Sequence, residues 1–283
     1  MGATAMSTIP KKIHLVWITS KHNPKELINN KGLAFDDVFP SWERCVTLSK
    51  TPFSSNQMNI NEFKACLFRL NSQHINAGDL NYIHNINKIS EKFDDWSITL
   101  WTNDRSLIPY TVSTLNERGI EVNELDRVIR DSTLLSSEAK EYVRNFKFQH
   151  DAGDIIDVLK YMVVEKYGGL SIDPNFEAIN KIPEEFLSKC SSIHHTQENF
   201  FFASKAGGEI LRQIIAKFTI DLAKSCDDTS AYFTRYGGVL NNNYKEYCHA
   251  FSAGPSRSVI MAAHEELERV VIGRDVSELS WEV

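Results

Sequence analysis

The segment spanning residues 153–175 places the strongest constraint on the fold of this 283-residue chain. Apolar side chains recur at helical spacing over 155–163, which is typical of a helix that packs one face on a sheet. Gly168 and Gly169 then supply the positive φ that commonly ends a helix. Residues 170–172 alternate apolar and polar side chains, as a strand does. The segment therefore predicts a helix that leads directly into a buried strand, as in α/β folds.

The predicted strand is followed by Asp173-Pro174-Asn175, which falls at its carboxyl end. Pro174 fixes its own φ and has no N–H, so the turn is stiff. The preceding helix carries Asp157, and we expect Asp157, Asp173 and Asn175 to meet at one rim of the sheet. Stiff oxygen ligands suit a hard cation such as Mg²⁺ or Mn²⁺, so Asp173 and Asn175 are the predicted metal ligands. The alternative is an Asx turn, in which both side chains bind only backbone groups.

Two more apolar runs, at residues 13–18 and 96–102, predict buried strands that end in polar residues. Helical patterns alternate with these strands, which favours an α/β fold with a mostly parallel sheet flanked by helices. Ligands of such sheets bind beyond the carboxyl ends of the strands. The stretch at about 20–95 exceeds what one crossover needs, so we expect a helical insertion after the first strand. Expected helices cover about 61–72, 81–92, 105–119 and 136–148, and a further strand is expected within 191–204.

The composition limits the classes of partner. A formal charge of -6 gives no basic excess, so we expect no nucleic-acid partner. Five widely spaced cysteines without a C-x-x-C pair argue against a disulfide framework or a structural zinc site. No apolar run reaches the roughly 18 residues that span a bilayer, and no signal-peptide pattern is present. We expect residues 1–8 to be a tail and 9–283 a single domain that acts in the cytoplasm or is delivered into a host cell as an effector. No H-E-x-x-H spacing supports a histidine-based metallohydrolase.

Three motifs together resemble a known family. IPKKIHLVWITS, LWTND and DVLKYMVVEKYGGLSIDPN, in this order, resemble the sugar-nucleotide glycosyltransferases that carry a DXD motif. Within this family the motifs resemble the catalytic domain of the large clostridial glucosylating toxins and the Och1-like and capsular sugar transferases. The family pattern has Asp, two residues, Arg, an apolar run, Gly-Gly, three residues and Asp-x-Asp. The spacing from Asp157 to Asp173 fits this pattern without a gap.

The resemblance implies a GT-A fold and a retaining hexosyltransferase. Such an enzyme would move a sugar from a UDP-sugar donor to a protein or glycan acceptor with the help of Mn²⁺ or Mg²⁺, and the toxin-like members suggest a bacterial effector. By position, Trp17 would stack on uracil while the backbone of Val16 and Ile18 reads the base edge. The alternative for Trp17 is a tryptophan of the hydrophobic core.

The same resemblance implies roles for the polar candidates. Asp157 would accept hydrogen bonds from sugar hydroxyls, and Lys160 would neutralise charge that grows on the leaving phosphate. Asp173 would contact the ribose, the sugar or a metal-bound water, and Asn175 would be the direct metal ligand. Asn199 would face the sugar or the departing phosphate.

Ser280 and Trp281 would cap the diphosphate from a closing C-terminal segment. The chain departs from the family pattern at two positions. Asn175 replaces the second aspartate and removes a negative charge, and Lys160 replaces arginine and loses its planar bidentate fork. The alternative function is therefore a weak or silent glycosyltransferase-like protein that binds a nucleotide or a partner through the same pocket.

Overall fold

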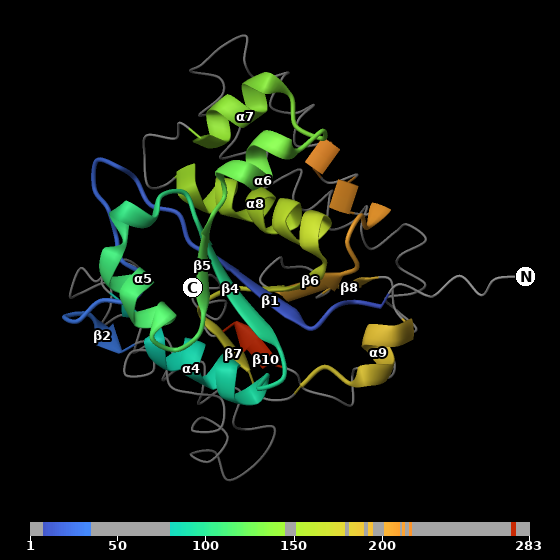
Figure 1. The fold of residues 1–283 in the computed structure, drawn as a ribbon, viewed down its shortest axis with the longest axis horizontal. Coiled ribbons are helices and arrows are strands. Elements are labelled where there is room, and N and C mark those ends of the chain that lie inside the picture. The colour runs from blue at the N-terminus through green and yellow to red at the C-terminus, as the bar shows by residue number, and fades with distance from the viewer. Residues whose placement is uncertain are drawn as a thin grey trace, which may run out of the picture.

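A six-stranded sheet forms the centre of the molecule (Figure 1). The computed structural model describes residues 8–34, 80–144, 151–178, 181–189, 192–194, 201–209, 211–212, 215–216 and 273–275. The strand order is β5-β4-β1-β6-β9-β8. The first four strands run parallel, while β9 pairs antiparallel with both β6 and β8. The strands are β1 (Lys12–Val16), β4 (Ser97–Thr102), β5 (Glu121–Glu124), β6 (Gly169–Ile172), β8 (Ser192–His194) and β9 (Phe201–Ser204).

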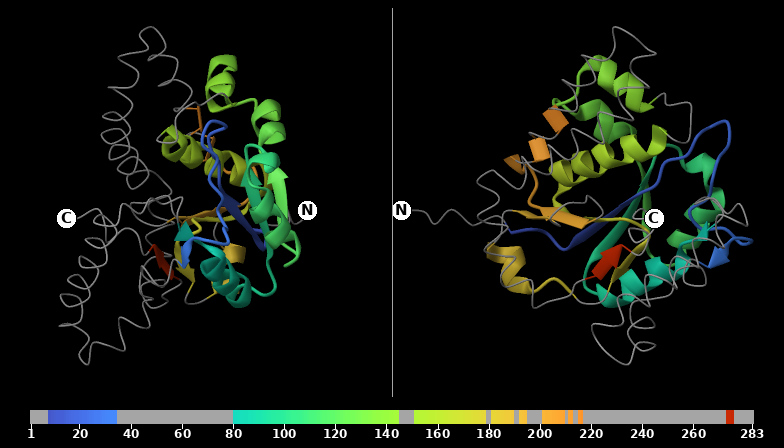
Figure 2. Two further views of the ribbon diagram at one scale, coloured as in Figure 1. Left: turned by 90° about the vertical axis from the view of Figure 1, so that its left-hand side faces the viewer. Right: turned by 180° about the vertical axis from the view of Figure 1, so that it is seen from behind.

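Helices cover both faces of this sheet, as Figures 1 and 2 show. On one face, α8 packs on β1 and β6 together with α6 and α7, and on the other face α4 and α5 bury their apolar side chains. The helices are α4 (Ile83–Lys92), α5 (Pro109–Asn116), α6 (Asp126–Asp131), α7 (Ser137–Arg144), α8 (Asp151–Tyr167) and α9 (Glu184–Lys189), with a 3₁₀ turn, η2, at Arg105–Leu107. Among the described residues, no helix is long and apolar enough to cross a membrane.

The pleat of the strands explains the two layers. Along β1, Ile13 and Leu15 are fully buried in the cluster on the α4 side, while Val16 belongs to the cluster on the α8 side. Along β6, Leu170 and Ile172 likewise face the α4 side. Successive side chains of a strand point to opposite faces. Since apolar side chains occur on both faces, each face can hold a layer of helices.

Two small sheets extend the structure. β7 (Phe176–Ala178) directly follows the Asp-Pro-Asn turn and pairs antiparallel with β10 (Gly273–Asp275). The pairing brings a segment near the end of the chain against the strand that leaves the turn. β2 (Leu33–Ala34) pairs parallel with β3 (Leu80–Asn81).

The predicted strands at 13–18 and 96–102 are confirmed as β1 and β4, and the predicted helices at 81–92 and 136–148 correspond to α4 and α7. The predicted helix at 105–119 is wrong in its first part. Asp104 accepts a hydrogen bond from the Ser106 N–H and begins a 3₁₀ turn, and α5 starts anew at Pro109. The strand expected within 191–204 is two strands, β8 and β9. The expected helix at 61–72 lies outside the described residues.

Candidate active site

The carboxyl ends of β1, β4 and β6 lie at the same edge of the sheet because these strands are parallel. Two polar residues tie the first two ends together. The Asn103 amide donates to the Thr19 carbonyl at 2.9 Å, and the Thr19 N–H donates to the Asn103 side-chain oxygen at 3.0 Å. Each residue follows its strand, so the pair fixes the edge on which the Asp-Pro-Asn turn of β6 also lies.

The Gly168-Gly169 pair sets how closely β6 approaches β1. Gly168 has φ 64° and Gly169 has φ 114°, conformations that favour glycine. A Cβ at Gly169 would lie 2.5 Å from the Lys12 carbonyl oxygen. The Gly168 carbonyl accepts a hydrogen bond of 2.8 Å from His14 Nε2, and His14 Nδ1 accepts one from Trp101. A buried histidine of β1 therefore holds the end of the helix. This contact fixes where β6 begins, and with it the position of Asp173 after β6.

Lys160 joins the two aspartates of the candidate site. Its ammonium forms an ion pair with Asp173 Oδ1 and lies 3.5 Å from Asp157 Oδ1. The lysine side chain is 3% exposed, whereas those of Asp157 and Asp173 are 36% and 22% exposed. The Lys160 ammonium therefore lies beneath two carboxylates that reach the surface.

Burial alone would lower the pKa of Lys160, because a charged ammonium loses its hydration. Coulombic attraction first to Asp173 and then to Asp157, with hydrogen bonds to both, outweighs this effect and raises the pKa above its usual value. Lys160 is therefore charged at neutral pH within the cluster. In the structure its ammonium contacts the two carboxylates. The resemblance had suggested instead that it neutralises charge on the leaving phosphate.

Trp17 immediately follows β1 at the same edge. Its indole N–H donates to the Lys25 carbonyl at 2.9 Å, and its ring lies 5.9 Å from that of Tyr82, tilted by 52°. The ring is partly buried and packs on the α4-side cluster. Val16 and Ile18 are 2% and 1% exposed. Because these fractions are for whole residues, the backbone is buried as well, and its contact with the base edge stays a prediction.

Trp17 and Asp173 approach the edge from different faces. The tryptophan packs on the α4 side, whereas the aspartate contacts Lys160 of α8. A ligand that contacts both must therefore lie across the carboxyl edge of the sheet, from one face to the other.

The turn itself is anchored from below. The buried Asn85 amide of α4 donates to the Pro174 carbonyl at 3.2 Å. Asp173 and Asn175 are both only partly exposed. Their carboxylate and amide oxygens are suitable ligands for Mn²⁺ or Mg²⁺. No group of three or more His, Cys, Asp or Glu side chains able to hold a metal occurs among the described residues. The two side chains have the right chemistry for such a cation, but Asn175 Oδ1 is buried, and a cation here would take its remaining ligands from outside these two residues.

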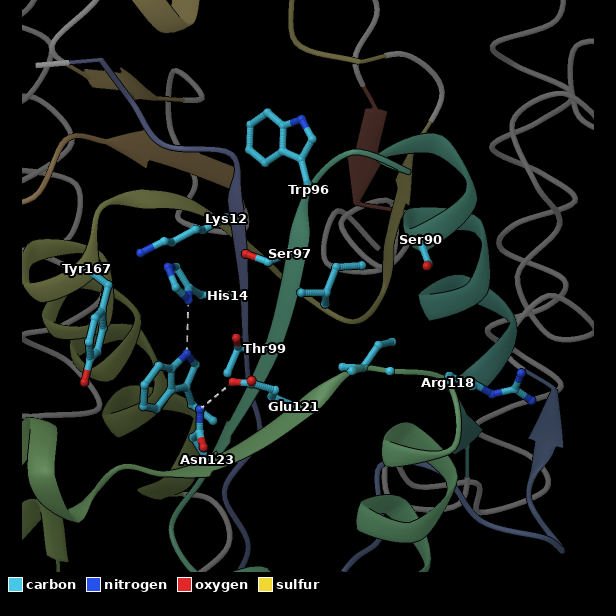
Figure 3. A pocket seen from close by; sticks show the side chains of 14 residues that line it. Lys12, His14, Ser90, Trp96, Ser97, Thr99, Arg118, Glu121, Asn123 and Tyr167 are labelled. Carbon is cyan, nitrogen blue, oxygen red and sulfur yellow. Dashed lines mark hydrogen bonds between the residues drawn. The ribbon is translucent and has the colours of Figure 1, made fainter.

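A pocket of about 530 Å³ lies elsewhere (Figure 3). Lys12, Ser97 and Glu121, which line it, are the first residues of β1, β4 and β5, so it opens toward the amino ends of the strands. Figure 3 shows Tyr167 on one side of it and Arg118 on the other. The pocket runs from these amino ends along the sheet to Trp101 and Asn123, and Asp173 does not line it. We place the candidate site at the carboxyl edge because the charged cluster and the strand ends meet there.

Three candidates, Asn199, Ser280 and Trp281, lie outside the described residues. Sequence reasoning did not identify Asn103, Thr19 or Asn85, which fix the edge and the turn. The polar break after each strand was the available signal for the first two.

No family model and no curated protein matches the sequence. Among solved structures, the chain is similar to the PaToxG glycosyltransferase, with a TM-score of 0.53, 10% identity, and coverage of 96% of this chain and 78% of the other. Another similar structure, a mutant transferase, has a TM-score of 0.37 at 11% identity, and the match covers 75% of this chain and 79% of the transferase chain. This similarity is too weak for inference. The likeness to PaToxG concerns the fold. The GT-A-like α/β fold predicted from the sequence is confirmed.

Proposed function

We propose that the chain is a glycosyltransferase that moves a hexosyl group from a UDP-sugar to a protein or glycan acceptor. The observation that carries this proposal is the Asp157–Lys160–Asp173 cluster at the carboxyl edge of a mostly parallel sheet. The fold similarity to a glycosyltransferase supports it. The choice of UDP and of a hexose rests on the resemblance of the sequence motifs to DXD enzymes.

In this proposal the role of each charged residue follows from how exposed its side chain is. Asp157, the more exposed carboxylate, accepts hydrogen bonds from the sugar hydroxyls. Trp17 contacts the uracil across the edge, and Asp173 and Asn175 hold Mn²⁺ or Mg²⁺. A cation held by these residues would supply positive charge against the negative charge that grows on the leaving diphosphate. Lys160 positions Asp173 from beneath, because its ammonium already contacts that carboxylate.

The bond that breaks joins the anomeric carbon to the diphosphate oxygen, and the bond that forms joins the same carbon to an acceptor oxygen. We propose that the acceptor attacks from the face that the diphosphate leaves, and that its proton passes to the departing phosphate oxygen. This course retains the anomeric configuration and requires no protein nucleophile.

Release of free UDP from a panel of UDP-sugars with Mn²⁺ tests the proposal. We expect slow hydrolysis by the wild type and at least a tenfold lower rate in Asp173→Ala, about 1.4 kcal/mol or more of transition-state stabilisation. Asp126→Asn, an exposed change on α6, is the control and should leave the rate unchanged. Equal release by wild type and Asp173→Ala would refute the enzymatic role.

A silent nucleotide-binding protein is the second candidate. It is favoured by the neutral Asn175 and by the ion pair that Asp173 already makes. UDP binding in calorimetry without UDP release from any donor would identify this case.

A further inference from the structure

We infer that Lys160 is a built-in counter-ion that weakens cation binding to the turn, so that Mn²⁺ or Mg²⁺ binds firmly only together with the diphosphate. This inference rests on the proposed function and assigns a regulatory role to one residue of the same site. It starts from the contact between the Lys160 ammonium and the carboxylate that the cation would share.

The first step concerns charge. Asp157 and Asp173 contribute two negative charges and Lys160 one positive charge, so the cluster has a net charge of −2 + 1 = −1. Asn175 adds an uncharged ligand. A divalent cation that approaches Asp173 therefore meets a weaker attraction than two carboxylates without the lysine would exert, because oxygen sites gain cation affinity from the number of charged ligands.

The second step concerns geometry. The Lys160 side chain is 3% exposed and contacts Asp173 from the buried side, so the ammonium cannot turn away into solvent when a cation arrives. Two cations bound to one carboxylate repel each other, and they do so strongly where water is excluded. The lysine thus opposes cation binding in the free protein.

The third step concerns the donor. A diphosphate brings negative charge to the exposed side of the cluster, opposite the buried lysine, and so compensates for what Asn175 and Lys160 remove. The affinity for the cation must then rise when the nucleotide is bound, and by linkage the affinity for the nucleotide must rise equally when the cation is bound.

Binding of Mn²⁺ alone, followed by the electron paramagnetic resonance signal of the free ion, tests the role of Lys160 without any turnover. Lys160→Met should bind Mn²⁺ at least tenfold more tightly than the wild type, and Lys160→Arg, which keeps the charge, should match the wild type. Lys166 lies on the same helix and forms an ion pair with Asp131. Lys166→Met removes the same charge as Lys160→Met, but from that pair. It should therefore leave Mn²⁺ affinity unchanged and so control for overall charge.

Circular dichroism shows whether Lys160→Met folds. A folded variant whose Mn²⁺ affinity equals or falls below that of the wild type overturns the inference. Should the variant not fold, the wild type alone decides: UDP should tighten Mn²⁺ binding at least tenfold, and equal affinity with and without UDP contradicts the inference. Failure of the proposed function looks different, because the protein then releases no UDP from any donor, whatever its affinity for Mn²⁺.

Discussion

Gly169 offers a sharp test of how the fold positions the candidate site. Its φ of 114° is one that side chains rarely adopt, and a Cβ there would lie 2.5 Å from the Lys12 carbonyl oxygen and 2.9 Å from the Lys12 Cβ. Both atoms belong to β1, the neighbouring strand, so they cannot move without parting β6 from β1. In Gly169→Ala, backbone strain costs about 1–3 kcal/mol, and overpacking adds about 1–3 kcal/mol. We expect a total loss of about 4 kcal/mol.

Gly119 provides the matched control. It also has a positive φ, 73°, but nothing lies within 4 Å of its Cβ position. Gly119→Ala should therefore lose only the strain energy, about 1–2 kcal/mol. Urea unfolding followed by circular dichroism gives both free energies of unfolding from midpoint and slope. If Gly169→Ala is no less stable than Gly119→Ala, the close approach of β6 to β1 does not constrain the chain as described.

Burial lowers the pKa of His14 from its usual value of 6.5 to about 4, so the unfolded chain takes up a proton that the folded chain excludes. The contribution of His14 to stability should therefore fall by up to about 3 kcal/mol as pH drops from 6.5 to 4; urea unfolding across this range should show a steeper loss in the wild type than in His14→Gln. For Trp17→Ala, loss of base stacking should weaken UDP binding in calorimetry by about 5- to 150-fold, with Trp17→Phe in between; unchanged affinity would leave Trp17 a core residue only.

The central elements were predictable because their patterns are strong. β1 and β4 are nearly continuous apolar runs, and α8 ends at a glycine pair before β6. Each of these segments is specified by its own residues, with period, β-branched content and glycine in agreement. Their order along the chain was enough to indicate a mostly parallel α/β sheet.

β5 was missed because Glu121–Glu124 contains one apolar residue, Val122. It is an edge strand in the described sheet, paired only with β4, and edge strands commonly carry charged side chains. The short helix α6 follows it at once and has little room for a periodic pattern. Both elements depend on packing against neighbours that no local pattern reveals.

The sequence indicated that the two aspartates lie close together, but it did not indicate their contacts. Sequence spacing placed Asp157 and Asp173 together, and the ion pairs with Lys160 confirm that they meet. Lys160 was expected to neutralise charge on the leaving phosphate, yet its side chain is buried and its ammonium contacts Asp173 and Asp157. The link between Thr19 and Asn103 joins residues 84 positions apart, which spacing within either segment cannot show.

A crystal structure with UDP and Mn²⁺ tests the location of the site most directly. We expect the diphosphate at the carboxyl edge, with the ion bound to Asp173 and Asn175 and the uracil against Trp17. A nucleotide bound instead in the pocket beside Lys12 and Arg118, at the amino ends of the strands, would contradict this assignment.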